Sequence, residues 1–420
     1  MKNNFVENFL KILVLGFGFF FLLQSQAILA TPLSINKWKP GHYVKIEDWQ
    51  LNNPTQMANI YNELSTTPSL RGVKVVILWG RYETRTGGVS TFNFSQLITI
   101  ANELETRGKH LILSFAWRTF TGSDGTPAAV AAAAAAASLI VPNDLAITTG
   151  TYGAGTPLEH ITFDKLFAYK DSTGAVKGYN LKLWKASVPY RIGLFMQALA
   201  GATNSNNVSF DNNNVLVQVS TTESSIAQPV VPYGTGTNST GTEALQVAGQ
   251  IDVLNNMNTH FIYTPIVATL NFPRWHVANM ASGGASSVLA IGKFGLGTPN
   301  SHYDNSLNTT VGNPGVLTYY PGLSNTVLLV PEVQGDDYES DYKQPTPTTY
   351  PAYLDIYQRL RNDLDANYIV WQRNSPFWLG GSIGGTPIPS VLNFLQSHST
   401  IISDASGAGG LNTTMPSALK

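Results

Sequence analysis

Two glutamates follow apolar segments that are typical of buried strands. Glu223 comes after residues 215–220 (VLVQVS), and Glu332 follows residues 326–331 (TVLLVP). Two carboxyl groups on either side of a glycosidic bond can hydrolyse it. One gives a proton to the leaving oxygen, while the other attacks the anomeric carbon or activates water. This chemistry requires a fold that brings the two strand ends to one crevice.

Each glutamate also has a structural interpretation. Glu223 could cap a following helix or pair with a nearby cation. Glu332 precedes three more acidic residues, Asp336, Asp337 and Glu339. These acids suit a solvated loop, or a loop that binds calcium through oxygen ligands. The presence of a partner at an equivalent strand end favours catalysis for both Glu223 and Glu332.

Strand-like and helix-like segments alternate along the chain. Eight segments rich in apolar residues predict strands: 41–48, 73–79, 110–117, 215–219, 260–269, 294–297, 325–333 and 367–372. The connections mostly carry apolar residues at helical spacing. The count and the length predict an α/β fold, a single-domain (β/α)8 TIM barrel with long loops at its C-terminal face. An open doubly wound sheet is the rival, but no glycine-rich phosphate turn follows the first strand.

On such a barrel, Glu223 ends the fourth strand and Glu332 ends the seventh. In this strand order the chain resembles the clan of retaining (β/α)8 glycoside hydrolases, which includes cellulase- and mannanase-type enzymes and has catalytic glutamates on strands four and seven. The resemblance spans the mature chain in strand order, and short motifs carry it. It implies that Glu223 is the general acid/base and Glu332 the nucleophile. The implied substrate is a β-linked poly- or oligosaccharide, with endo action preferred.

The resemblance also implies residues that bind the substrate. It assigns Arg81, just beyond strand two, to holding the nucleophile ionised, although Arg81 could instead form a surface ion pair. His302 and Tyr303 follow strand six, where a tyrosine commonly hydrogen-bonds the nucleophile. Trp371 matches the sugar platform at the end of strand eight. Trp117 ends strand three, where a tryptophan either packs the upper barrel or stacks on sugar.

One position departs from the clan. The residue before the acid/base is Thr222, where the clan usually carries an asparagine that binds the sugar 2-hydroxyl. A threonine hydroxyl is shorter and lacks the paired donor and acceptor of an amide. Two other functions therefore stay open. One is a catalytically inactive carbohydrate-binding barrel of the cell surface, and the other is a hydrolase that holds a metal in the acidic loop after Glu332.

Composition argues against several classes of partner and cofactor. The chain of 420 residues has 25 Lys+Arg and 26 Asp+Glu, a net charge of -1, so nucleic acid is not an expected partner. The 18 Tyr, 19 Phe and 8 Trp offer apolar surface for packing or for stacking on sugars. Cysteine is absent, which excludes disulfides and thiolate metal sites. The histidines lack metal-ligand spacing, and we expect a monomer with no metal and no cofactor.

The N-terminus resembles a secretory signal. Lys2 and Lys11 flank a short n-region, residues 12–23 (ILVLGFGFFFLL) form an apolar core, and residues 25–27 (SQA) offer a cleavage site. A single membrane anchor is the alternative, but the run is short for a span of about 20 residues. We therefore expect a signal peptide within residues 1–30 and a barrel domain over 31–420. The mature protein would be secreted or periplasmic, with no stable membrane span.

Overall fold

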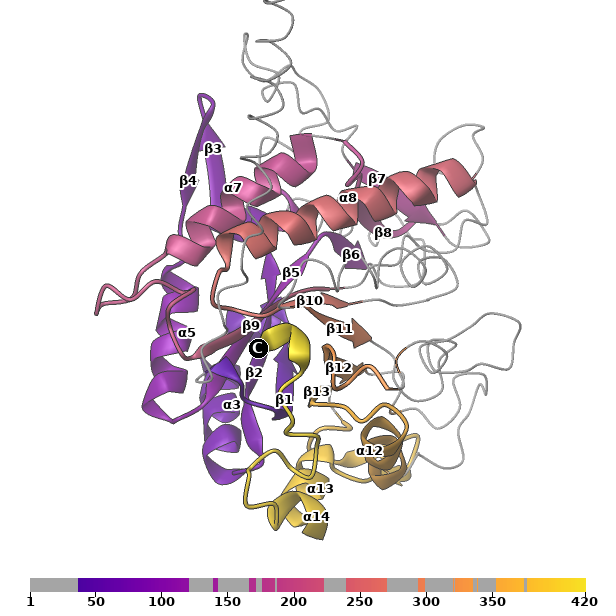
Figure 1. The fold of residues 1–420 in the computed structure, drawn as a ribbon. Helices are drawn as coiled ribbons and strands as arrows, with labels where there is room; N and C mark the ends of the chain where they lie inside the picture. Colours follow the sequence, from indigo (N-terminus) through magenta and orange to yellow (C-terminus); the bar gives the residue numbers. More distant parts are fainter. Residues whose placement is uncertain are drawn as a thin grey trace, which may run out of the picture. The chain divides into compact units, whose positions relative to one another are not determined.

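Eight parallel strands close into a barrel (Figure 1). Their order is β1 (Gly41–Ile46), β2 (Leu70–Leu78), β5 (His110–Ala116), β9 (Leu216–Thr221), β10 (Ile266–Thr269), β11 (Phe294–Thr298), β12 (Leu328–Val333) and β13 (Tyr368–Gln372). Strand β13 pairs with β1 and completes the circle. Each strand overlaps one of the eight predicted segments, so the predicted (β/α)8 fold is confirmed.

The structure is a computed structural model that describes part of the chain. The described residues are 37–120, 139–142, 166–170, 176–185, 187–222, 239–269, 294–298, 320, 322–334, 338, 353–373 and 376–420. All of them belong to one compact unit, Leu33–Lys420. The predicted signal peptide lies outside them. Within the described ranges, no helix has the length and apolar character needed to cross a bilayer.

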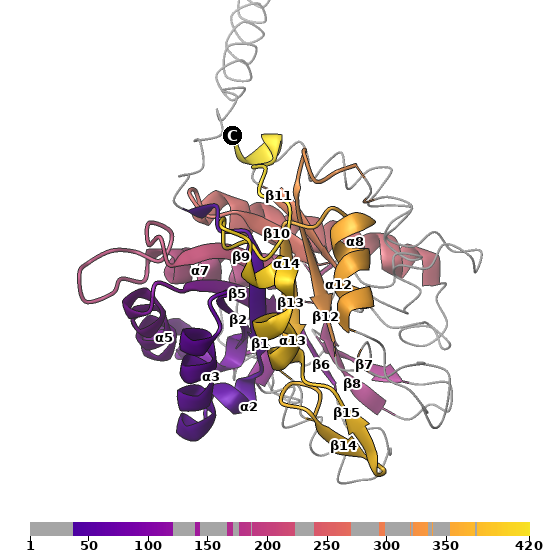
Figure 2. The same ribbon diagram turned by 90° about the horizontal axis from the view of Figure 1, so that it is seen from below.

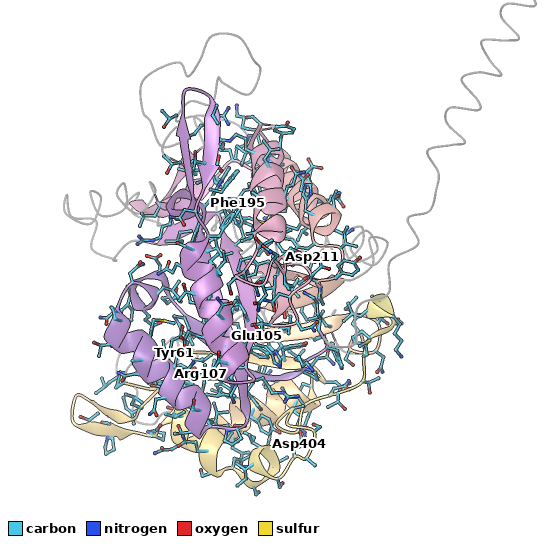
Figure 3. The ribbon with its side chains drawn as sticks, turned by 90° about the vertical axis from the view of Figure 1, so that its left-hand side faces the viewer. Tyr61, Glu105, Arg107, Phe195, Asp211 and Asp404 are labelled. Atoms are coloured by element: carbon cyan, nitrogen blue, oxygen red, sulfur yellow. The ribbon has the colours of Figure 1, made fainter. Side chains whose placement is uncertain are left out.

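Helices cover the barrel from outside. Those that follow β1, β2, β5, β9, β12 and β13 are α3 (Pro54–Thr66), α5 (Ser95–Thr106), α7 (Ser187–Gly201), α8 (Ser239–His260), α12 (Tyr353–Asn362) and the pair α13 (Val391–Ser397) and α14 (Ser399–Ile402). Figure 3 shows α3 and α5 side by side, with the Arg107 guanidinium 4.6 Å from the centre of the Tyr61 ring. Helices α7 and α8 also lie side by side (Figure 1). The C-terminal helices α12 to α14 gather beside β12 and β13 (Figure 2).

Additional elements follow the C-terminal ends of the barrel strands. They are α2 (Asp48–Leu51) after β1, α4 (Trp79–Tyr82) and the hairpin β3 (Glu83–Thr86)–β4 (Val89–Phe92) after β2, β6 (Arg118–Phe120) after β5, and the hairpin β14 (Gly381–Ile383)–β15 (Thr386–Ile388) after β13. Strand β6 pairs with β8 (Val176–Leu181), which pairs with β7 (Leu166–Lys170). These additions agree with the long connections expected at this face.

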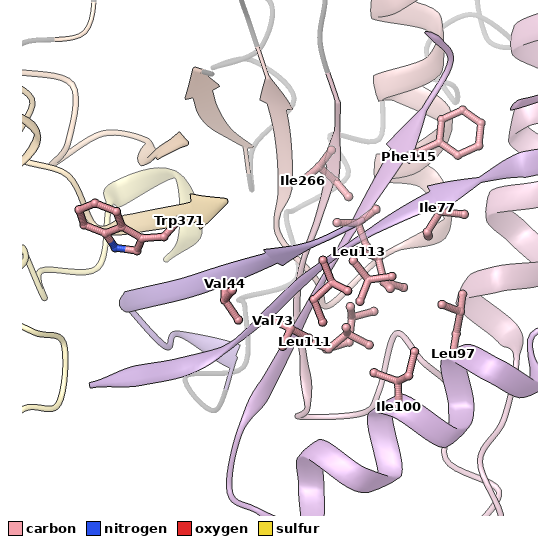
Figure 4. Packing of buried hydrophobic residues seen from close by; sticks show 14 of the residues in the cluster. Val44, Val73, Ile77, Leu97, Ile100, Leu111, Leu113, Phe115, Ile266 and Trp371 are labelled. Carbon is pink, nitrogen blue, oxygen red and sulfur yellow. The ribbon is translucent and has the colours of Figure 1, made fainter. Parts of the chain in front are cut away.

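Two apolar cores lie on the two sides of the barrel wall. The outer one packs the strands against the helices, and Figure 4 shows Leu97 and Ile100 of α5 facing Leu111 and Leu113 of β5. The inner one fills the barrel with Tyr43, Ile112, Val217, Val267, Leu328, Val330, Tyr368, Val370 and Leu419. Because both faces of each strand are covered, the strand sequences are nearly continuous apolar runs.

The N-terminal end of the barrel is closed by both ends of the described unit. Trp38 and Met415 pack against the inner core. The buried Lys37 ammonium donates to the Asn213 and Leu216 carbonyls at 3.0 and 2.9 Å and to the Thr264 hydroxyl at 2.8 Å, at the starts of β9 and β10. These contacts fill the N-terminal end of the barrel in the part of the chain that the structure describes.

Gly72 tests how closely the strands approach each other. A Cβ on Gly72 would lie 1.9 Å from the backbone oxygen of its pairing partner His110, so Gly72→Ala should force β2 and β5 apart. We expect the free energy of unfolding, measured by urea denaturation, to fall by about 1–3 kcal/mol or more. Gly201→Ala is the matched control, because a Cβ there meets nothing within 4 Å. Equal stability of the two variants would contradict the tight pairing.

Candidate active site

The inner face of the barrel changes from apolar to polar within one step along its strands. Inward-facing residues on a strand are two positions apart. Two positions beyond Tyr43, Ile112, Val267 and Val330 of the inner core stand Lys45, Ser114, Thr269 and Glu332. This polar layer lies toward the C-terminal end, where active sites of TIM barrels form.

Glu332 is the central charge of this layer. It is 3% exposed, and the two lysine ammonium groups of β1 and β2 hold its carboxylate. Lys45 Nζ lies 2.5 Å from Oε1, and Lys74 Nζ lies 2.8 Å from Oε2. Lys74 is itself buried. Both carboxylate oxygens are therefore engaged by cations inside the barrel.

The two lysines set the protonation state of Glu332. Burial by itself would raise the pKa of the carboxyl group, because it disfavours the charged form. The charges and hydrogen bonds of Lys45 and Lys74 outweigh burial and lower the pKa from 4.5 to about 2. Glu332 is consequently an anion at any pH near neutrality, which suits a nucleophile or a base and excludes a proton donor.

A chain of polar contacts leads from Glu332 toward solvent. Lys45 Nζ also lies 3.3 Å from Oε1 of Glu47, whose side chain is 31% exposed just beyond the end of β1. Gln372 Nε2 donates to the same Glu47 oxygen at 3.3 Å. Gln334 Nε2 donates to Glu332 Oε1 at 3.5 Å. The buried carboxylate is thus connected, through Lys45, to the partly exposed Glu47 beyond the end of β1.

Two buried groups near this layer have no hydrogen-bond partner among the described residues. The Gln218 side-chain amide is unpartnered at both its oxygen and its nitrogen, and so is the Thr269 hydroxyl. Gln218 pairs laterally with Ile112 of the inner core, so it faces the barrel interior. Buried amides and hydroxyls are normally hydrogen-bonded, so these groups are donors and acceptors inside the barrel that the described residues leave unsatisfied.

The second predicted glutamate, Glu223, lies outside the described residues. The chain is described up to Thr222, whose backbone N–H donates to the Phe115 carbonyl at 2.9 Å. Strand β9 therefore runs to the same end of the barrel as Glu332, as expected. The distance between the two carboxyl groups stays a prediction. His302, Tyr303 and the acids Asp336, Asp337 and Glu339 also lie outside the described residues.

The prediction that Trp371 forms a sugar platform is wrong. Its side chain is fully buried in the outer core, where Nε1 donates to His42 Nδ1 at 3.0 Å and the ring lies 6.1 Å from that of Phe394 on α13. It points outward because its strand neighbour Val370 faces the interior. Trp117 is also buried, 6.4 Å from the Phe115 ring. Packing of the barrel, and not sugar binding, therefore explains both tryptophans.

The exposed tryptophan at the barrel mouth is Trp49, which the sequence analysis did not identify. It lies on the short helix α2, directly after β1, and is 60% exposed. No other tryptophan in the described ranges is exposed to this extent. Its position in a short polar segment after a strand was the available signal.

The prediction that Arg81 holds Glu332 ionised is wrong. Its guanidinium forms an ion pair with Asp48 of α2, and Lys45 and Lys74 take the role assigned to it. The signal for these lysines was present in the sequence, since each is a cation at an inward position of a mostly apolar strand. A contribution of Arg81 to substrate binding stays a prediction.

Among the residues that the structure describes, no three histidine or acidic side chains are grouped as metal ligands. The acidic loop that could hold a metal lies outside those residues, so the metal-dependent alternative is untested.

Comparisons with solved structures support the fold. The catalytic domain of a β-amylase from Paenibacillus polymyxa matches 85% of this chain over 97% of its own, with 11% identity and a TM-score of 0.50. An endo-glycoceramidase II from Rhodococcus sp. matches at 13% identity (87% of this chain, 80% of that one, TM-score 0.48), and a psychrophilic family 10 endo-β-1,4-xylanase at 11% (85% and 96%, TM-score 0.45). No family model and no curated protein matches. The chain thus shares its barrel fold with the β-amylase domain.

The low pKa of Glu332 predicts how its contribution to stability depends on pH. A carboxyl group whose pKa is lowered in the folded state stabilises the fold above its unfolded pKa, and this stabilisation is lost as the pH falls through the folded value. The difference in unfolding free energy between wild type and Glu332→Gln should be constant above about pH 5. It should shrink between pH 4.5 and about 2, as urea denaturation at a series of pH values would show. A difference that is unchanged down to about pH 2.5 would contradict the ion-pair assignment.

Proposed function

We propose that this chain is a glycoside hydrolase whose nucleophile is Glu332. The observation that carries the proposal is a buried carboxylate, kept ionised by two lysines, toward the C-terminal end of the barrel. The likeness in fold to the β-amylase domain is consistent with this function. The expected signal peptide would make the enzyme secreted or periplasmic, acting as a monomer on a neutral β-linked poly- or oligosaccharide.

The proposed reaction proceeds with retention in two steps. Glu332 attacks the anomeric carbon, and the glycosidic C–O bond breaks while the leaving oxygen takes a proton from Glu223. The Glu223 carboxylate then removes a proton from water, the water oxygen attacks the anomeric carbon, and the ester electron pair returns to Glu332. Glu223 must start protonated, so its pKa must be higher than that of Glu332.

The surroundings of Glu332 fit the nucleophile better than the acid. A proton donor needs a raised pKa, whereas Lys45 and Lys74 hold Glu332 ionised. The acid must therefore come from another strand, and Glu223 follows the strand that leads to the same rim. Thr222 would place its hydroxyl where the related enzymes place an amide, so its contacts with the sugar 2-hydroxyl are expected to be weaker.

Trp49 is the proposed sugar-stacking surface. An exposed indole beside the mouth can pack against the apolar face of a pyranose ring, and Trp49 occupies the rim next to β1. The aromatic platform of this site would therefore stand on the first connection of the barrel and not at the end of the eighth strand.

A second candidate function is a carbohydrate-binding barrel without turnover. The specific observation in its favour is that both oxygens of Glu332 are already occupied by ammonium groups, as in a structural ion cluster. Thr222, in place of the usual asparagine, also favours this second function. A protein of this kind would migrate more slowly during electrophoresis in a gel that contains its polysaccharide. It would release no sugar from that polysaccharide.

Substitution of the two glutamates tests the proposal on 4-nitrophenyl β-glycosides and β-linked polysaccharides. Glu332→Gln should lower kcat at least about a thousandfold on every substrate, because no ester can form. Glu223→Gln should cost about 10²–10⁴-fold on polysaccharide and much less on the nitrophenyl glycoside, whose leaving group needs little protonation. The exposed Glu105 of α5 (Figure 3) provides the control Glu105→Gln, which should be active.

The same experiment can contradict the proposal. Retention requires that the first product seen by NMR has the β configuration. If wild type cleaves no substrate of the panel yet is retarded by one polysaccharide in a gel, the binding barrel is correct. Activity of Glu332→Gln at the level of Glu105→Gln would remove Glu332 from the mechanism.

Trp49→Ala tests the stacking surface. On an oligosaccharide long enough to reach the rim, KM should rise about tenfold, since an aromatic contact contributes about 0.5–1.5 kcal/mol beyond its buried area. On a 4-nitrophenyl monosaccharide, KM and kcat should be unchanged, because the ring does not reach the reacting bond. A uniform loss on both substrates would instead indicate a structural role for Trp49.

A further inference from the structure

Lys45 is shared between two carboxylates of unequal burial. Its Nζ lies 2.5 Å from Oε1 of Glu332 and 3.3 Å from Oε1 of Glu47. Glu332 is almost fully buried, whereas Glu47 is about a third exposed. Because both oxygens contact one nitrogen, they can be no farther apart than the sum of these two distances. Lys45 Nζ therefore contacts both carboxyl groups from one position.

The four charges form an alternating chain, Glu47–Lys45–Glu332–Lys74. Lys74 is 2% exposed and pairs with Glu332 Oε2. Without Glu47, the two lysines would face one carboxylate, and the group would carry an excess positive charge. Glu47 makes it neutral. An unpaired charge inside a protein is costly, so each member depends on the others.

The first step of the proposed reaction changes this balance. When Glu332 forms its ester, a carboxylate oxygen bonds to the anomeric carbon, the electron pair of the broken bond leaves with the leaving group, and the negative charge of Glu332 disappears. In the ester intermediate, Lys45 and Lys74 face a neutral group. In the transition states before and after it, the sugar also carries partial positive charge. Within the four-residue chain, only Glu47 still offers a negative charge.

We propose that Glu47 is a positioning residue that accepts the Lys45 ammonium when Glu332 becomes an ester. This inference rests on the proposed function, and it adds a residue that touches neither the reacting bond nor the proton in transfer. By competing for Lys45 before the reaction, Glu47 also weakens the grip of Lys45 on Glu332, which leaves the nucleophile more reactive.

The position of Glu47 favours this role over that of the acid/base. Glu47 extends β1, and Glu332 lies on β12, with only β13 between the two strands. The two carboxyl groups therefore stand on the same wall of the barrel, whereas a catalytic pair must flank the bond from two sides.

Glu47→Gln removes the charge while preserving the shape of the side chain. The start of α2 retains its backbone contact, since the Glu47 N–H donates to Gln50 Oε1 at 2.9 Å. Glu47→Asp keeps the charge on a shorter side chain. Glu105→Gln, on the exposed face of α5, matches the change in net charge away from the site.

The test uses 2-deoxy-2-fluoro-β-glycosyl fluorides of glucose, galactose, mannose and xylose as probes. Attack by Glu332 breaks the C–F bond and releases fluoride, a leaving group that needs no proton, so Glu223 is not required for labelling. Mass spectrometry measures the rate of labelling, and the return of activity after removal of free probe measures hydrolysis of the ester. The probe that labels wild type fastest is then used for all variants.

We expect Glu47→Gln to be labelled at least about tenfold more slowly than wild type, without slower hydrolysis of the ester, because the ester form has lost its compensating anion. Glu47→Asp should recover part of the labelling rate, and Glu105→Gln should behave as wild type. Labelling of Glu47→Gln at the wild-type rate would overturn the inference alone. Equal slowing of labelling and of ester hydrolysis in Glu47→Gln would also overturn it, because it would indicate a structural role for Glu47. If no probe labels wild type, the proposed function fails, and the inference fails with it.

Discussion

The structure depends on the compensation of one buried negative charge. Moving an isolated carboxylate from water into a protein interior is prohibitively costly unless cations and hydrogen bonds replace its hydration. Glu332 meets this condition only because β12, β13, β1 and β2 are neighbours in the closed circle, which brings Lys45 and Lys74 to its two oxygens. Closure of the barrel therefore also forms the ion pairs that compensate the charge of Glu332.

Other buried acids are satisfied differently. Glu63 binds the Arg373 guanidinium at 2.7 Å and accepts a hydrogen bond from Trp378 Nε1 at 2.9 Å. Glu83 binds Arg191 at 2.5 Å and accepts from the Trp79 indole. Both of these clusters combine an arginine with a tryptophan, and they tie the segments after β2 and β13 to helices α7 and α3. Glu332 has two lysines and no tryptophan, and of these three described acids it is the one that faces the barrel interior.

This contrast explains how a chain with only 12% charged residues uses them. Arg373 holds Glu63 through two parallel donors, Nε to Oε2 at 2.9 Å and Nη2 to Oε1 at 2.7 Å, a geometry that fixes the direction of the contact. A lysine ammonium is a compact charge on a flexible stem, so Lys45 can move between partners that lie at different depths. In the proposed reaction Glu332 loses and regains its charge in each turnover, and the second kind of contact suits such a change. The buried clusters hold the connections in place, and the lysines leave the centre adjustable.

Much of the fold was predictable from the sequence. The strand count, the parallel barrel and the placement of Glu332 at a strand end follow from apolar periodicity, because strands covered on both faces must be continuously apolar. The direction of individual side chains was not predictable from strand position alone. Trp371 was expected at the mouth, and Trp117 either there or in the packing of the upper barrel, but both side chains lie in the outer core. Arg81 was expected beside Glu332, yet the register places Lys45 and Lys74 there and leaves Arg81 to Asp48.

What the sequence by itself determined is which segments become strands and that a carboxylate follows the seventh of them, because hydrophobic pattern is local information. Only the tertiary structure decided which charges surround that carboxylate. The partners of Glu332 come from the first two strands of the chain, and a contact between residues so far apart exists only once the sheet has closed on itself. The pKa of Glu332, and with it the chemistry open to this residue, is therefore a property of the closed barrel.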